Sequence, residues 1–130
     1  MMRAYLDTSA AAKLLQRQAE SAALQLFANR DDVELVSTLL LETELRRFAT
    51  RSGVSQTAVS DVLDGIALYG FEDSDFKAAG LLPSATLRSL DALHVQGAIV
   101  AGADCMVAYD ARLVTACAEV GLKVVQPGIT

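Results

Sequence analysis

The sequence predicts an α/β fold of three layers, α/β/α, in which helices cover both faces of a central, mostly parallel sheet of five strands. Short, continuously apolar segments alternate with segments of helical composition, which is typical of parallel strands buried on both faces. The length of 130 residues is close to the commonest size of one domain. No internal repeat, low-complexity stretch or Pro/Gly/Ser-rich linker interrupts the pattern, so residues 1–130 are expected to form a single domain.

The first two strands and the helices between them are predicted from composition. Arg3–Leu6 is a short apolar strand that ends at Asp7. The segments Ser9–Gln16 and Glu20–Asn29 are rich in Ala, Leu and Gln, which favours helices. After a polar turn, Val33–Val36 is the second strand.

Two helices and a weak strand fill the middle of the chain. Thr38 can cap a helix, and the helix that it opens runs to about Arg51 and ends at Gly53. Ser55–Leu68 is a second helical segment. Tyr69–Glu72 is a weak third strand.

The last part of the chain continues the alternation of helices and strands. Asp73–Leu82 is a short helix that Pro83 stops, and Ser89 is expected to cap a long helix over Leu90–Ala101. The remaining predicted elements are the strand Cys105–Tyr109, the helix Ala111–Val120 and the strand Leu122–Val125.

Composition narrows the class of protein. With 16 acidic against 11 basic residues the net charge is −5, which argues against general electrostatic binding to nucleic acid. No apolar stretch is long enough for a transmembrane helix, and Asp7 and Lys13 interrupt the apolar start, so we expect a cytoplasmic protein without membrane contact. Cys105 and Cys117 are expected to be buried thiols. The single histidine excludes a ribonuclease that uses a His–His acid–base pair.

Two aspartates follow predicted strands. Asp7 ends the first strand and Asp110 ends the fourth, and each opens a helix. Doubly wound sheets bind ligands at the carboxyl ends of their strands, where the winding direction switches. Asp7 and Asp110 therefore face one crevice if their strands are neighbours. Asp91 lies in the first turn of the helix before the fourth strand, and Glu44 lies in the second turn of the helix after the second strand.

Each of these acids also has a simpler structural explanation. Aspartate is a preferred N-cap, and negative charge suits a helix N-terminus, so any one of them alone is more readily a cap than a catalyst. Four carboxylates packed close together repel, and some are forced to protonate. A divalent cation removes that penalty, and oxygen ligands suit Mg²⁺ or Mn²⁺.

Helical periodicity does not decide which of two glutamates belongs to the acidic site. Glu42 and Glu44 flank the apolar stripe of their helix at similar angles, one on each side. Asp104 is set apart, because it begins the fourth strand whereas Asp110 follows its end. A strand of that length places Asp104 at the opposite edge of the sheet.

At these residues the sequence resembles the PIN-domain family, and within it the VapC-type toxins of bacterial toxin–antitoxin pairs. The resemblance covers nearly the whole chain and rests on four motifs in order. YLDTSA is similar to the first acidic motif and carries Asp7. VSTLLLETEL resembles the second, which selects Glu44 with Glu42 as runner-up. RSLDALHVQGAIVAG resembles the third and carries Asp91, and CMVAYDARLVTACAEVGLKVVQPG resembles the closing strand, acid, helix and strand, with Asp110.

The resemblance implies a PIN-like, metal-dependent endoribonuclease. Asp7, Asp91 and Asp110 would be direct or water-mediated ligands of one or two Mg²⁺ or Mn²⁺ ions, and Glu44 would bind metal or orient the attacking water. Hydrolysis would leave a 5′-phosphate and a 3′-hydroxyl. One position departs from the family pattern: Ala108 lies two residues before the last acid, where the family often has Thr or Ser.

The resemblance also implies partners. RNA would be the substrate, and a cognate VapB-type antitoxin would cover the acidic crevice with its C-terminal segment and place an Arg among the carboxylates. A homodimer is expected, and a heterotetramer or larger assembly with the antitoxin. In the dimer the helices from Thr38 to Arg51 and from Ser55 to Leu68 are expected to bury their apolar stripes against a second copy.

Several neighbours of the four acids are open to two interpretations. His94, three residues after Asp91 on the same helix face, is expected to be packed or hydrogen-bonded rather than part of the site. The arginines after Glu44 either form a solvated face with local ion pairs or contact RNA phosphate or an antitoxin. Possible contributors at the rim of the crevice are Thr8, Ser9, Lys13, Arg46, Arg47, Arg51 and Arg112.

Other classes of function are weaker matches. A catalytically weak PIN-like module that binds RNA or protein is favoured by Ala108 and the acidic net charge, and disfavoured by the presence of all four acids. A phosphatase of the haloacid dehalogenase type needs a second Asp two residues after the first, where Ser9 stands. A phospho-receiver needs an acidic pair beside the first strand and further partners, which Glu72 and Asp73 do not reproduce.

Overall fold

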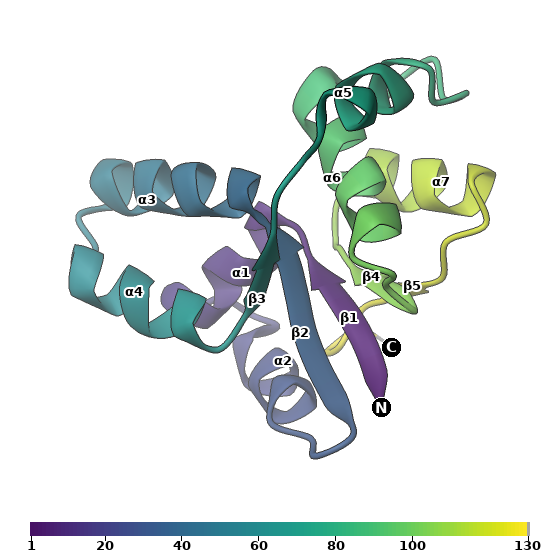
Figure 1. The fold of residues 1–130 in the computed structure, drawn as a ribbon. Helices are drawn as coiled ribbons and strands as arrows, with labels where there is room; N and C mark the ends of the chain where they lie inside the picture. The colour runs from purple at the N-terminus through teal and green to yellow at the C-terminus, as the bar shows by residue number, and fades with distance from the viewer. Residues whose placement is uncertain (130) are drawn as a thin grey trace.

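The computed structural model describes residues 1–129, and within them a five-stranded sheet lies between two layers of helices (Figure 1). All strands are parallel, in the order β3-β2-β1-β4-β5. The strands are β1 (Met2–Leu6), β2 (Val33–Thr38), β3 (Ala67–Tyr69), β4 (Cys105–Val107) and β5 (Val124–Val125). The helices are α1 (Thr8–Leu15), α2 (Ser21–Ala28), α3 (Leu39–Ser52), α4 (Gln56–Asp64), α5 (Asp73–Gly80), α6 (Ser89–Val100) and α7 (Ala111–Glu119). The predicted α/β/α architecture is confirmed.

Two hydrophobic cores hold the layers together. Side chains of a strand point alternately to its two faces, so Ala4 and Leu6 of β1 join the core beneath α1 to α4, whereas Tyr5 joins the core beneath α6 and α7. Figure 1 shows α1 to α4 on one side of the sheet and α5 to α7 on the other. Cys105 and Cys117 are buried thiols in these cores, as predicted.

The winding direction switches between β1 and β4. From β1 the chain adds β2 and β3 on one side, then crosses to add β4 and β5 on the other. In register, Ala4 pairs with Leu35 of β2 on one side and with Cys105 of β4 on the other. The carboxyl ends of β1 and β4 therefore lie side by side, which brings Asp7 and Asp110 to one edge of the sheet. Asp104 lies at the opposite edge, where its carboxylate accepts a hydrogen bond from the backbone N–H of Arg3 (2.8 Å).

The boundary between α4 and β3 differs from the prediction. The helix predicted over Ser55–Leu68 ends at Asp64, because Gly65 caps it and Ile66 turns into the core. The strand predicted over Tyr69–Glu72 instead covers Ala67–Tyr69. Pairing with β2 decides this position, since Ala67 lies opposite Val36 in the register.

Two predicted helix caps also change. Arg88, not Ser89, is the N-cap of α6, and Ser89 is its first helical residue. Thr38 does occupy the N-cap position of α3, but its side chain makes no capping hydrogen bond. Its hydroxyl instead lies 3.2 Å from the hydroxyl of Tyr5.

The apolar stripes of α3 and α4 are not left for a second copy. Leu41 and Leu45 of α3 and Val59 and Leu63 of α4 are buried in the core of this chain. The expectation that these stripes pack across a dimer interface is therefore wrong, and the homodimer stays a prediction without that support. Within residues 1–129, no helix has the length and hydrophobicity needed to cross a bilayer.

Candidate active site

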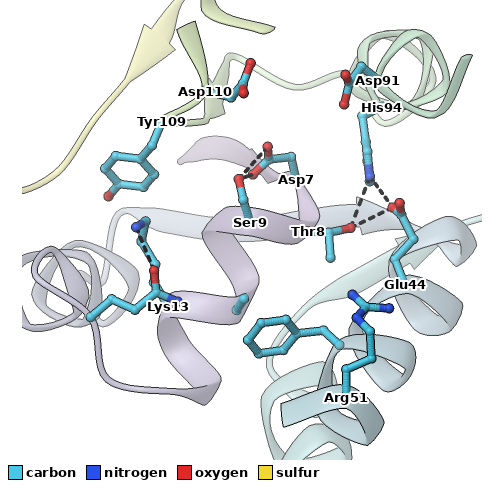
Figure 2. A pocket seen from close by; sticks show the side chains of 13 residues that line it. Asp7, Thr8, Ser9, Lys13, Glu44, Arg51, Asp91, His94, Tyr109 and Asp110 are labelled. Atoms are coloured by element: carbon cyan, nitrogen blue, oxygen red, sulfur yellow. Dashed lines mark hydrogen bonds and ion pairs between the residues drawn. The ribbon is translucent and has the colours of Figure 1, made fainter. Parts of the chain in front are cut away.

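A pocket of about 610 Å³ opens at the carboxyl ends of β1 and β4 (Figure 2). Its volume is in the range of ordinary ligand sites. All four acids that the sequence singled out line it, although they come from four separate segments of the chain. The lining residues are Asp7, Thr8, Ser9, Ala12, Lys13, Gln18, Glu44, Phe48, Arg51, Asp91, His94, Tyr109 and Asp110.

Asp7 and Asp110 each cap a helix as well as line the pocket. The Asp7 carboxylate accepts a hydrogen bond from the backbone N–H of Ala10 (2.8 Å) at the start of α1. The Asp110 carboxylate accepts from the N–H groups of Arg112 (2.9 Å) and Leu113 (3.1 Å) at the start of α7. The structural and the functional interpretations of these residues are thus compatible, because capping fixes each carboxylate at the pocket.

Asp7 is the most buried of the four acids, with 5% of its surface exposed. Burial raises its pKa, and the nearby charge of Asp91 adds to this. Hydrogen bonds from Ala10 and from the hydroxyl of Ser9 (2.9 and 3.1 Å) oppose the shift. A negative charge on Asp7 is therefore unfavourable unless a positive group is near.

Asp91 projects from the first turn of α6 toward the same pocket. Burial raises its pKa, and the charges of Asp110 and Glu44 raise it further, against the attraction of Arg112. Asp110 and Glu44 therefore lie near enough to Asp91 to disfavour its charged form, as expected for acids that share one site.

The structure separates Glu44 from Glu42. Glu44 lines the pocket, and its Oε1 accepts hydrogen bonds from the hydroxyl of Thr8 (2.6 Å) and from Nε2 of His94 (2.6 Å). Burial acts to raise the pKa of Glu44, but these two hydrogen bonds outweigh it, so the pKa is lowered. Glu42 forms an ion pair with Arg46 one turn later on the same helix.

His94 is buried and hydrogen-bonded, as predicted, yet it also touches the site. Nδ1 lies 2.8 Å from the Tyr5 hydroxyl, and Nε2 lies 3.2 Å from Thr8 Oγ1 besides its bond to Glu44. The spacing of His94 and Asp91 on one helix gave the sequence signal for its position. The contact with Glu44 joins residues fifty positions apart, and no local pattern predicts it.

The rim carries two basic residues and two aromatic rings. Lys13 forms an ion pair with Glu20 (2.8 Å), and its Nζ lies 4.7 Å from the centre of the Tyr109 ring. None of the ion pairs among residues 1–129 engages Arg51. Phe48 is partly buried against the core and also contributes to the pocket wall. Tyr109 also lines the pocket, which was not predicted from the sequence. The only signal in the sequence was its position next to Asp110.

The donor set of the pocket fits a hard divalent cation such as Mg²⁺ or Mn²⁺, because its acidic ligands are carboxylate oxygens. Burial first, and then neighbouring carboxylates, disfavour the charged forms of Asp7 and Asp91, and a nearby cation would favour those charged forms. Within residues 1–129, no group of three or more His, Cys, Asp or Glu side chains is arranged to hold a metal ion by itself. Mg²⁺ commonly keeps several waters and uses one or two carboxylates of the protein, a mode of binding that does not need such a group.

The parallel sheet and its acidic edge are those of a PIN domain. A family model described as PIN domain matches residues 4–119, and the chain belongs to this family. Among its relatives are two proteins of Mycobacterium tuberculosis. Ribonuclease VapC47 is 37% identical over 131 residues, and Ribonuclease VapC35 is 35% identical over 130 residues, with 95% of this chain and 96% of the relative covered in each case.

A solved structure shares the fold. It is the crystal structure of VapBC2 from Rickettsia felis bound to a DNA fragment from their promoter, which is similar with a TM-score of 0.74 and 15% sequence identity. The similarity covers 97% of this chain and 99% of the chain in that structure. At this level of identity it establishes the shared fold.

Proposed function

We propose that this chain is a metal-dependent endoribonuclease and the toxin of a toxin–antitoxin pair. The observation that carries the proposal is the convergence of Asp7, Glu44, Asp91 and Asp110 on one pocket at the switch point of the sheet. The relatives named ribonuclease support the reaction class. The fold alone does not, because one fold hosts many functions.

The four acids have distinct places in this proposal. Asp7, Asp91 and Asp110 hold Mg²⁺ or Mn²⁺, directly or through water. Such an ion supplies positive charge against the phosphodiester and lowers the pKa of a bound water. Glu44 binds the ion or orients the attacking water. Its lowered pKa keeps it ionised for either role, and the caps of α1 and α7 hold Asp7 and Asp110 in place.

RNA contact requires positive charge beside this acidic pocket. Arg51 is the basic rim residue best suited to bind a phosphate, because Lys13 is already paired with Glu20. Phe48, one turn before Arg51 on α3, offers an apolar ring in the same wall. An exposed arginine next to a partly buried ring is suited to a single-stranded segment, in which phosphate and base are both accessible.

The partner of the proposed toxin is a cognate VapB-type antitoxin. The crystal structure of VapBC2 from Rickettsia felis bound to a DNA fragment from their promoter supports this. We propose that the C-terminal segment of the antitoxin covers the acidic pocket with an arginine, and that DNA is bound by the antitoxin. A homodimer, and a heterotetramer or larger assembly with antitoxin in the cytoplasm, complete the proposal.

Cleavage of total cellular RNA by the purified, antitoxin-free protein tests the proposed reaction. The assay has three arms: wild type with Mg²⁺ or Mn²⁺, wild type with EDTA, and Asp7→Ala with metal. Fragments are expected in the first arm only, with 5′-phosphate ends. No fragments in any arm, from protein shown to be folded, would instead favour a PIN-like module that binds RNA or protein without cutting.

A further inference from the structure

A chain of buried polar groups lies behind Glu44. Nε2 of His94 is 2.6 Å from Glu44 Oε1, and Nδ1 of the same ring is 2.8 Å from the Tyr5 hydroxyl (Figure 2 shows the Glu44 side of this chain). The Tyr5 hydroxyl is in turn 3.2 Å from Thr38 Oγ1. Four elements, β1, β2, α3 and α6, thus meet in one hydrogen-bonded line.

The direction of these hydrogen bonds follows from the chemistry of the groups. An ionised carboxylate only accepts, so the proton between His94 and Glu44 is on Nε2. Burial raises the pKa of Tyr5 to about 12, so its hydroxyl keeps its proton and can donate to Nδ1. The same hydroxyl can accept from Thr38. A single arrangement of protons therefore satisfies every member of the line.

Burial decides how His94 can act. Only 3% of its surface is exposed, and Tyr5 and Thr38 are fully buried. His94 lines the pocket with almost none of its surface exposed, and both of its ring nitrogens are engaged by protein groups, so its influence on the reaction is expected to pass through Glu44 or Thr8. Within residues 1–129, the two hydrogen bonds that Glu44 accepts both fall on Oε1, so neither of them engages Oε2.

We propose that His94, held in place by Tyr5, is a positioning residue that fixes the orientation of the Glu44 carboxylate in the pocket. This inference rests on the proposed ribonuclease function, because it assigns His94 a part in that reaction. It differs from a purely structural role, in which His94 fills the core and its loss lowers stability without changing the turnover of the folded enzyme.

The single histidine makes a direct test possible without any assay of activity. In protein labelled with ¹⁵N only in histidine, the imidazole nitrogen and proton resonances all belong to His94. We expect a proton on Nε2 that exchanges slowly with water. Glu44→Ala should speed this exchange and shift the resonance, whereas Glu42→Ala, on the same helix but paired with Arg46, should change neither. An Nε2 without a proton, or a resonance indifferent to Glu44→Ala, overturns the inference.

Two substitutions of His94 separate positioning from packing. The side-chain amide of Gln can reach the place of Nε2 and donate to Glu44, whereas that of Asn reaches only the place of Nδ1. We expect His94→Asn to lower kcat by about tenfold or more, with KM nearly unchanged and kcat partly restored in His94→Gln. Tyr5→Phe removes the hydrogen bond to Nδ1 of His94 and should also lower kcat. Each kcat is expressed per folded molecule, with folding followed by circular dichroism.

The outcomes distinguish this inference from the proposed function. In a Glu44→Ala background, His94→Asn should lower kcat no further, because its effect passes through Glu44. Active wild type with an unchanged kcat in His94→Asn overturns the positioning role and leaves the proposed function standing. Wild type that cleaves no RNA overturns the proposed function, and with it any role for His94 in cleavage.

Discussion

Gly97 of α6 leaves the space that the Tyr5 hydroxyl occupies. A Cβ atom on Gly97 would lie 2.7 Å from that hydroxyl oxygen and 2.6 Å from Cγ2 of Thr38. Both neighbours are fully buried and cannot move aside into solvent. The absence of a side chain at Gly97 is thus a condition for the hydrogen-bonded line from Thr38 through Tyr5 to His94.

Gly97→Ala should therefore destabilise the fold and lower turnover. Overpacking a core costs about 1–3 kcal/mol, against about 1 kcal/mol that alanine recovers inside a helix. Thermal unfolding is expected at a lower temperature than in wild type. Gly80→Ala is the matched control, since nothing lies within 4 Å of a Cβ at that helical glycine. Equal melting temperatures for the two variants would contradict the packing argument.

Glu44 and Glu42 offer a matched pair on one helix. Glu44→Gln removes the charge that faces the pocket, and we expect the rate of RNA cleavage to fall by about 100-fold or more. Glu42→Gln removes only an ion pair with Arg46, which is worth about 0.5 kcal/mol of stability, and should leave the rate unchanged. Initial rates on one defined RNA decide between them. A comparable loss of rate in both variants would place the acidic site elsewhere on α3.

Arg51 and Arg47 test the proposed phosphate contact in the same way. Both are exposed residues of α3, but only Arg51 lines the pocket. Arg51→Ala should raise KM for RNA about tenfold, the value of one charged hydrogen bond, and reduce the salt dependence of binding by about one phosphate contact. Arg47→Ala should do neither. Equal effects of the two substitutions would indicate general attraction of RNA to α3 rather than a contact at the pocket.

Asp7→Asn should stabilise the protein when no metal is present. Burial disfavours the charged form of Asp7, which is why its pKa is raised, and Asn removes the charge while it keeps an acceptor for the N–H of Ala10. We expect the melting temperature in EDTA to rise by a few degrees. Millimolar Mn²⁺ should raise the melting temperature of wild type but not of Asp7→Asn. A rise of equal size in both would show that Asp7 is not a ligand.

Tyr5 gives a prediction at alkaline pH. Its pKa is raised to about 12 in the folded protein, above an ordinary value of about 10. The neutral hydroxyl therefore stabilises the fold fully below about pH 10, and this contribution is lost as the pH rises toward 12. The loss amounts to about 3 kcal/mol. The free energy of unfolding, measured with denaturant at pH 9 and above pH 11, should fall more steeply with pH for wild type than for Tyr5→Phe. An equal fall in the two proteins would contradict this prediction.

The fold and the place of the acids could be predicted because local signals define them. Asp7 and Asp110 each follow an apolar strand and begin a helix, and capping holds both where the prediction put them. That β1 and β4 are neighbours was a condition in the prediction, and the strand order meets it. Asp7 and Asp110 line the pocket, and their roles in metal binding stay predictions.

Other features depend on tertiary contacts that the sequence does not display. Helical angles left Glu42 and Glu44 equivalent, and only contact with Thr8 and His94 separates them. The end of α4 was predicted too late, because pairing of Ala67 with Val36 determines where β3 lies. The apolar stripes of α3 and α4 were assigned to a dimer because a stripe shows that it is buried but not against which surface.

The switch point between β1 and β4 has a consequence for biosynthesis. A growing chain that has reached the end of β3 already contains the strands β1 and β2. It also contains α1 to α4, the helices that cover one face of the sheet. It carries Asp7 and Glu44, whereas Asp91 and Asp110 are still to be added. The second neighbour of the central strand, β4, emerges only afterwards. The four-carboxylate pocket is therefore incomplete on the ribosome until translation has passed Asp110.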